Sequence, residues 1–153
     1  MNILVTGATG FIGSKLVAKL RYRGQNVKEF EGDVTKVEDV INSIKNVDVV
    51  YHLAAELDET LGKEKLFNVN VKGTENLLEA AAKARVKKFI HMSSVGVMGD
   101  VKGIADESTP CNPKTLYEES KTGAEKLVMS YQELLPVTAL RAAVVYGANG
   151  YWK

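Results

Sequence analysis

The sequence predicts an α/β fold, a doubly wound parallel sheet of about five strands with helices on both faces. Two observations predict it. Short apolar runs alternate along the chain with longer segments of helical periodicity, which is the pattern of parallel strands joined by crossover helices. The first run is followed at once by three glycines at three-residue spacing. The 153 residues are enough for one domain with a substantial core.

The first half of the chain is expected to form three strands and three helices. Each strand is a short apolar run, and the third is apolar on both faces, as a central parallel strand must be. Each helix carries apolar residues at helical spacing. In chain order these are a strand over 2–6, a helix over 11–23, a strand over 27–32, a helix over 36–45, a strand over 47–54 and a helix over 63–84. In the helix over 36–45, the residues expected to face inward are Val37, Val40, Ile41 and Ile44.

The second half continues the alternation with a strand over 87–93, a helix over 116–134 and a strand over 137–146. The helix over 116–134 has apolar residues at core spacing, among them Met129. Residues 94–115 form a connection with little periodicity. A loop of that length in a compact domain is usually functional.

The region between Gly24 and Asp33 is unusually short, because only one strand fits before the acidic residue at its end. A doubly wound nucleotide domain normally places two strands and a helix there. The expected strand order is therefore 2-1-3-4-5 rather than 3-2-1-4-5-6.

Gly7, Gly10 and Gly13 connect the first strand to the first helix. Free N–H groups at a helix N-terminus point at an anion, and the helix dipole adds to the attraction. The glycines allow a tight turn, close approach of a pyrophosphate and close helix–strand packing. We therefore expect a dinucleotide site whose first contacts are Gly7, Thr9, Gly10, Phe11, Ile12 and Gly13.

Composition limits the other possibilities. Lysine and arginine number 20 against 19 acidic residues, and this balance gives no electrostatic reason to expect nucleic acid. We expect no membrane span and see no signal peptide, and the lone Cys111 is typical of a cytoplasmic protein. His52 and His91 fall in buried strands without further ligands nearby, so no metal site is expected.

Tyr117 and Lys121 form a Tyr-x-x-x-Lys pair at the start of a helix, and Ser94 ends a strand 23 residues before the tyrosine. With the three glycines, this pattern resembles the extended short-chain dehydrogenase/reductase superfamily, in particular its NAD-dependent epimerase/dehydratase family. The similarity covers nearly the whole chain. Further matches are Gly32-Asp33-Val34, Leu53-Ala54-Ala55, the segment from Asn68 through Asn70 to Thr74, and the loop residues Glu107, Pro110 and Pro113.

The resemblance implies a single NAD(P)-binding Rossmann-like domain over residues 1–153 and a nucleotide sugar as substrate. It also implies a possible homodimer through the two long helices. It assigns the catalytic roles to Ser94, Tyr117 and Lys121. The remaining cofactor contacts that it implies are Glu31, Asp33, Val34, Leu53, Ala54, Ala55, Asn70, Tyr117 and Lys121.

The tyrosine pair also has a chemical rationale. A phenol has a pKa of about 10, so it acts as a base at neutral pH only when its anion is stabilised. Lys121 lies four residues after Tyr117 and so on the same helix face. Its ammonium and an oxidised nicotinamide are both expected to lower the pKa of Tyr117.

Glu31 and Asp33 lie 18 and 20 residues beyond Gly13, where a dinucleotide domain carries the acid that binds ribose. Because the connection is short, Asp33 fits either the ribose or the adenine contact. An acid at this position favours NAD over NADP.

The chain also departs from the family pattern. Relatives typically continue beyond this point into a substrate-binding lobe. This sequence stops at residues 150–153, so we expect the lobe to be missing. Ala142 and Val144 stand where relatives often have proline and asparagine. Two hypotheses follow: a hydride-transferring enzyme of the epimerase/dehydratase type, or a non-catalytic NAD-binding module that needs a partner lobe.

Overall fold

The fold is organised around a five-stranded sheet in the order β2-β1-β3-β4-β5. We describe residues 1–148 of a computed structural model, so the segment 150–153 named above lies outside the described residues. The strands are β1 (Asn2–Thr6), β2 (Asn26–Glu29), β3 (Val49–His52), β4 (Lys88–Ser94) and β5 (Val137–Ala142). All four pairings are parallel. The expected α/β class, Rossmann-like topology and strand order are confirmed.

The register brings the carboxyl ends of the central strands to one edge of the sheet. Thr6 is opposite His52, and His52 is opposite His91. Ser94, the last residue of β4, is opposite Ala142, the last residue of β5. Side chains that follow these strands therefore gather at the same edge.

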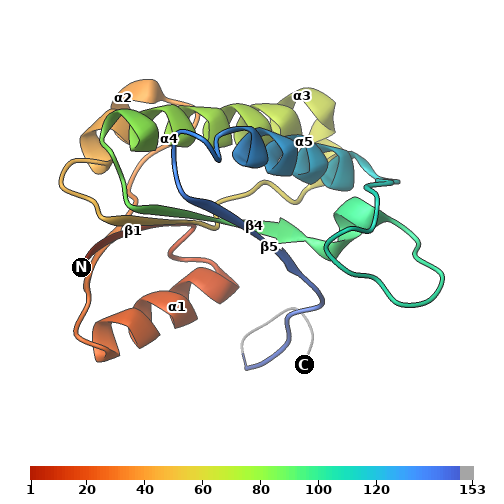
Figure 1. Ribbon diagram of the computed structural model, residues 1–153, viewed down its shortest axis with the longest axis horizontal. Helices are drawn as coiled ribbons and strands as arrows, with labels where there is room; N and C mark the ends of the chain where they lie inside the picture. Colours follow the sequence, from red (N-terminus) through yellow and green to blue (C-terminus); the bar gives the residue numbers. More distant parts are fainter. Residues whose placement is uncertain (149–153) are drawn as a thin grey trace.

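Helices cover both faces of the sheet unequally (Figure 1). Helix α1 (Phe11–Tyr22) lies on one face. The other face is covered by α2 (Val37–Ser43), α3 (Gly62–Phe67), α4 (Gly73–Lys83) and α5 (Leu116–Ser130). Short turns are η1 (Glu59–Leu61), the π-helical η2 (Asn68–Lys72) and η3 (Val95–Met98).

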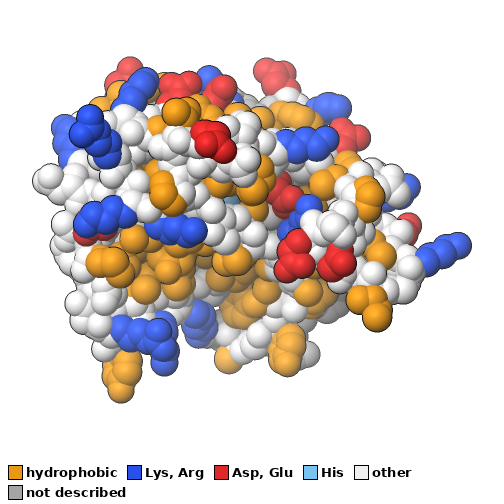
Figure 2. All heavy atoms as spheres, in the orientation of Figure 1, with side chains coloured by type: hydrophobic (Ala, Val, Ile, Leu, Met, Phe, Trp, Pro, Cys, Tyr) orange, Lys and Arg blue, Asp and Glu red, His pale blue; other side chains and the backbone are white. Residues whose placement is uncertain are grey.

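The core has two parts because side chains alternate along each strand. Leu4 of β1 packs in the larger cluster, with Phe89 of β4 and Leu77 of α4. Ile3 and Val5, its neighbours in the sequence, pack in the smaller cluster under α1. On the face shown in Figure 2, acidic and basic side chains are interspersed, in keeping with the near-zero net charge.

The segment expected to form a helix over 63–84 is helical from Gly62 to Lys83 and contains the π-helical turn η2. Other local expectations are wrong. The last strand ends at Ala142 instead of continuing to residue 146. Helix α2 has seven residues and buries Val40 and Ile44, whereas Val37 and Ile41 are about half exposed because so short a helix covers the core with one stripe only. Met129, expected in the core, is 43% exposed near the end of α5.

Candidate functional site

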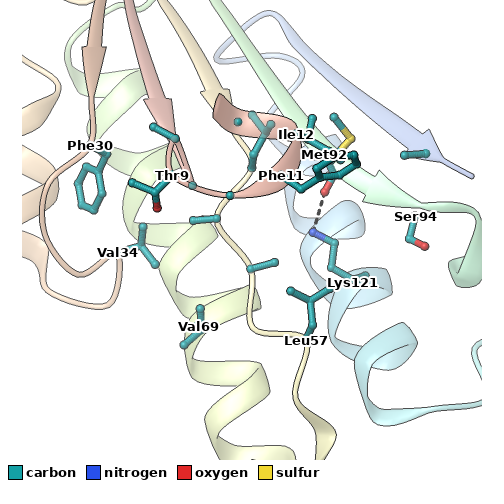
Figure 3. Close-up of a pocket in the computed structure, with 18 of the residues that line it drawn as sticks. Thr9, Phe11, Ile12, Phe30, Val34, Leu57, Val69, Met92, Ser94 and Lys121 are labelled. Carbon is teal, nitrogen blue, oxygen red and sulfur yellow. Dashed lines mark hydrogen bonds between the residues drawn. The ribbon is translucent and has the colours of Figure 1, made fainter. Parts of the chain in front are cut away.

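A cavity of about 900 Å³ opens where the carboxyl ends of the strands meet the start of α1. This is the place where open parallel sheets bind ligands. Figure 3 shows its lining, with the glycine turn between two ends of the cavity. The expected site residues that line it are Gly7, Thr9, Gly10, Phe11, Ile12, Gly13, Glu31, Asp33, Val34, Leu53, Ala54, Ala55, Ser94, Tyr117 and Lys121.

The glycine turn is shaped by close backbone contacts. Gly7 has a φ of +65°, and a Cβ there would lie 2.7 Å from the backbone nitrogen of Ala54. A Cβ at Gly13 would overlap the carbonyl oxygen of Gly7, so α1 packs directly onto the turn. Gly10 precedes the helix and has no side chain to cap the first N–H groups. These groups are available to an anion.

One end of the cavity is acidic and aromatic. Phe30 follows β2, and its N–H donates to the oxygen of Val5 at 2.9 Å. Figure 3 places its ring near Thr9 and Val34, at the end opposite Lys121 and Ser94. Phe30 was expected inside the strand over 27–32, so the sequence patterns did not predict that this ring would line the cavity.

Three carboxylates line this end, and they differ in their partners. Glu29 pairs with Arg21 at 2.8 Å. Asp33 accepts hydrogen bonds from the N–H and hydroxyl of Thr35, which lower the pKa of its carboxyl. Glu31 is exposed. Among the described residues that line the cavity, Lys121 is the only basic side chain, and it lies at the other end.

The other end is formed by α5 and the end of β4. Thr115 and Glu118 make a capping box that starts α5, and the N–H of Tyr117 donates to Glu59 at 2.9 Å. These contacts fix the first turn, which carries the tyrosine. Tyr117 and Lys121 then face the cavity from successive turns, and Ser94 faces it from β4.

The ammonium of Lys121 was expected to stabilise the Tyr117 phenolate, but it is hydrogen-bonded to the end of β4. Lys121 is 2% exposed. Its ammonium donates to the backbone oxygen of Met92 at 2.7 Å and lies 3.4 Å from Nε2 of His91. Burial lowers the pKa of Lys121 to about 8, with Glu125 opposing the shift. Burial raises the pKa of the Tyr117 hydroxyl, which is opposite to the expected direction. The reason is that burial removes water from the phenolate and so disfavours the charged form.

The two serines at the end of β4 have different surroundings. The hydroxyl of Ser93 donates to Glu125 at 2.5 Å, and Arg141 donates to the same carboxylate. Ser94 accepts a hydrogen bond at 3.1 Å from the N–H of Gly96, so its own hydroxyl proton is free for another partner. Ser94 is therefore the serine available to a ligand.

Asn70 was expected to contact the cofactor, but it is not among the residues that line the cavity. It is 1% exposed and bonds to the backbone of Glu56 and to Ser120. Lining residues that sequence reasoning missed include Phe30, Leu57, Val69 and Met92. The last three have ordinary apolar side chains, and no sequence signal distinguishes them from core residues.

The two histidines are buried, as expected. Burial lowers the pKa of His52 to about 3, so its imidazole is neutral. In the part of the chain that the structure describes, no three histidine, cysteine or acidic side chains are grouped to hold a metal ion. Over the same residues, no helix has both the length and the apolar character needed to cross a lipid bilayer.

Comparison with known proteins identifies the family. The sequence profile of the NAD dependent epimerase/dehydratase family matches residues 3–151. The chain belongs to this family. Relatives include a 3-beta-hydroxysteroid dehydrogenase of Mycolicibacterium neoaurum, 34% identical over 84% of this chain and 42% of the relative.

Solved structures of family relatives share the fold. A short-chain dehydrogenase/reductase superfamily protein of Agrobacterium tumefaciens, solved with bound NAD, is 30% identical with a TM-score of 0.87, over 92% of this chain and 48% of that chain. A UDP-glucose 4-epimerase of Thermotoga maritima, solved with UDP-glucose, is 31% identical with a TM-score of 0.88, over 96% of this chain and 57% of that chain.

The chain spans about half the length of the family relatives that it matches. It is also shorter within the matched region. An alignment of 155 positions takes in only 84% of the 153 residues, so the M. neoaurum relative has residues with no counterpart here.

Proposed function

We propose that this chain is the NAD-binding domain of an epimerase/dehydratase-type enzyme that transfers hydride between the cofactor and a hydroxyl of a nucleotide-sugar-like substrate. The observation that carries the proposal is that the glycine turn and the Ser94, Tyr117 and Lys121 side chains line one cavity. When bound, the nicotinamide ring would supply the hydride acceptor. The relatives that were solved with NAD and with UDP-glucose support the choice of ligands.

The chain's own residues fit a dinucleotide. The uncapped N–H groups at the start of α1 would hold the pyrophosphate. Because Gly7 and Gly13 have no Cβ, the turn can pack closely against the backbone around it. Glu29 is paired with Arg21, which leaves the exposed Glu31 and the second carboxylate oxygen of Asp33 to accept the ribose hydroxyls. Three carboxylates line this end, and the guanidinium of Arg21 is already paired with Glu29, so a 2′-phosphate would face mainly negative charge. NAD is therefore proposed over NADP.

At the other end, Tyr117 would take or give the proton of the substrate hydroxyl, and Ser94 would hydrogen-bond the same oxygen. Lys121, with a pKa of about 8, is mostly protonated at neutral pH and would supply the positive charge that favours the phenolate. For this its ammonium has to turn from Met92 toward the cavity. Hydrogen bonds from the ammonium to ribose hydroxyls would offset the lost bond.

The second candidate is a non-catalytic NAD-binding module. It is favoured by the present partner of Lys121, which is the Met92 oxygen rather than Tyr117. Homodimerisation and a cytoplasmic location stay predictions under either candidate.

Titration calorimetry with NAD and NADP, together with turnover assays on UDP-glucose and on a 3β-hydroxysteroid, separates the candidates. Binding of NAD with turnover supports the enzyme, and binding without turnover supports the module. No binding of either dinucleotide would contradict both. Sedimentation of the same samples reports whether the chain dimerises.

A further inference from the structure

Four buried polar side chains lie behind the cavity and have no place in the function proposed above. They are Thr6 of β1, His52 of β3, Asn70 of η2 and Thr74 of α4, and each is at most 1% exposed. None of them lines the cavity. They come from four separate elements, yet they form one continuous set of hydrogen bonds. Buried polar groups need such partners, and a fully satisfied network specifies its geometry.

The direction of each hydrogen bond follows from the chemistry of its two ends. The hydroxyl of Thr74 donates at 2.6 Å to the backbone oxygen of Asn70, which can only accept. Its single proton is therefore used, and the 2.9 Å contact with His52 must be donated by Nε2–H of the imidazole.

A neutral imidazole with a proton on Nε2 has a bare Nδ1, which accepts. The 2.7 Å contact between His52 Nδ1 and the Thr6 hydroxyl is therefore donated by Thr6. The Thr6 oxygen in turn accepts from the N–H groups of Leu53 and Ala54, at 3.2 and 3.1 Å. The network thus runs in one direction, from these two amides to the Asn70 carbonyl.

Asn70 continues the network toward α5. Its side-chain oxygen accepts from the N–H of Glu56 at 2.7 Å, and its amide group donates to the Glu56 oxygen and to Ser120. Ser120 donates its own proton to the backbone oxygen of Tyr117 at 2.7 Å. The network therefore joins the segment after β3 to the helical turn that carries Tyr117.

The segment held in this way is a wall of the cavity. Leu53, Ala54, Ala55 and Leu57 all line it. Thr6 holds the beginning of this segment, and Asn70 holds Glu56 near its end. The side chains of His52 and Thr74 do not line the cavity and bond to neither the side chains nor the amides of residues 53–57, but they connect the two holding groups.

We propose that His52 and Thr74 are positioning residues, which pre-organise the cavity wall over residues 53–57 through a buried hydrogen-bond network of fixed direction. Only the identity of the ligand rests on the proposed function. The network itself is a property of the folded chain, so the two are tested by different measurements.

The first measurement is the tautomer of His52, read from the imidazole ¹⁵N shifts of the wild-type chain. We expect the Nε2–H form at pH 7. A proton on Nδ1 at that pH would overturn the proposal, and this result needs no variant.

The second measurement uses Thr74→Val, which keeps the shape but removes the hydroxyl, and Thr74→Ser, which restores it. We expect the valine variant to exchange the amide protons of Leu53, Ala54 and Glu56 faster. We also expect its NAD dissociation constant to rise roughly tenfold, the effect of losing about one buried hydrogen bond. The serine variant should recover most of both.

Thr122→Val is the matched control, because Thr122 is also buried and its hydroxyl has no hydrogen-bond partner within residues 1–148. It should leave exchange and affinity unchanged. A folded Thr74→Val chain with wild-type exchange at the three amides, or with wild-type NAD affinity, would overturn the proposal. A wild-type chain with protected amides and no NAD binding would contradict the proposed function and leave the network standing.

Discussion

Lys121 donates a hydrogen bond of 2.7 Å from its ammonium to the backbone oxygen of Met92, and this bond joins α5 to β4. The ammonium is thereby held at the end of the strand, beside a second residue that lines the cavity. The sequence spacing that places Tyr117 and Lys121 on one helix face does not determine which of them bonds to which partner. Two properties of the chain, its pH dependence and its catalytic competence, depend on this lysine.

The depressed pKa of Lys121 predicts a pH-dependent stability. In the folded chain its pKa is about 8, below the ordinary 10.5. Between these values the unfolded chain binds a proton that the folded chain has released, so the free energy of unfolding rises with pH. From pH 8 to 10.5 the wild type should gain on the order of 3 kcal/mol relative to Lys121→Met. Urea unfolding of both chains across this range measures it.

Lys126→Met provides the control for this experiment, because Lys126 lies on the same helix but is exposed. Its unfolding free energy should follow that of the wild type at every pH. If the unfolding free energies of the wild type and Lys121→Met change in parallel with pH, the pKa of the buried Lys121 ammonium is not lowered.

Tyr117→Phe should abolish turnover and leave NAD affinity within about twofold of the wild type, because it removes one hydroxyl and no proposed anchor of the pyrophosphate. Calorimetry and the turnover assay that gives a signal with the wild type measure the two effects. Tyr22→Phe, at an 86% exposed position far from the cavity lining, is the control. An unchanged turnover rate would remove Tyr117 from the mechanism.

Gly7→Ala should prevent NAD binding and destabilise the chain. The added Cβ meets the Ala54 backbone at 2.7 Å, and the φ of +65° is unfavourable for alanine by about 1 kcal/mol or more. Gly24→Ala has a similar φ of +71° but no neighbour within 4 Å, so it isolates the backbone cost. Denaturation and calorimetry compare them, and equal behaviour of the two variants would refute the close contact.

Glu31→Ala should weaken NAD binding by about tenfold or more, because a hydrogen bond to a carboxylate contributes about 1.5–3 kcal/mol. The preference for NAD over NADP should fall, because less negative charge would face the 2′-phosphate. Glu38→Ala, at an exposed position on α2 outside the cavity lining, should change neither dissociation constant. An unaltered NAD/NADP ratio would exclude Glu31 as the ribose contact.

Phe30→Leu should weaken binding of NAD and of AMP, because a base stacked on an aromatic ring gains about 1–3 kcal/mol. Nicotinamide mononucleotide has no adenine, so its affinity should stay at the wild-type value. Equal losses for all three ligands would indicate a general disturbance of the cavity rather than a stacking contact.

The sequence alone predicted what depends on local spacing. Alternating apolar runs and helical segments predicted the five strands and their order, and the short stretch before Asp33 predicted a sheet with one strand fewer. The glycine spacing and the Tyr-x-x-x-Lys pair predicted which side chains share a cavity. These features follow from neighbours in the chain and from the parallel sheet, which brings strand ends to one edge.

Tertiary structure alone decided how those side chains are bonded. It turned Lys121 toward Met92, moved Asn70 from the expected cofactor contact into the network behind the wall, and set the tautomer of His52. Each outcome depends on a partner at least 22 positions away in the sequence. Burial then sets the protonation of Lys121 and His52, because removing water penalises charge. Burial is a property of the folded chain alone.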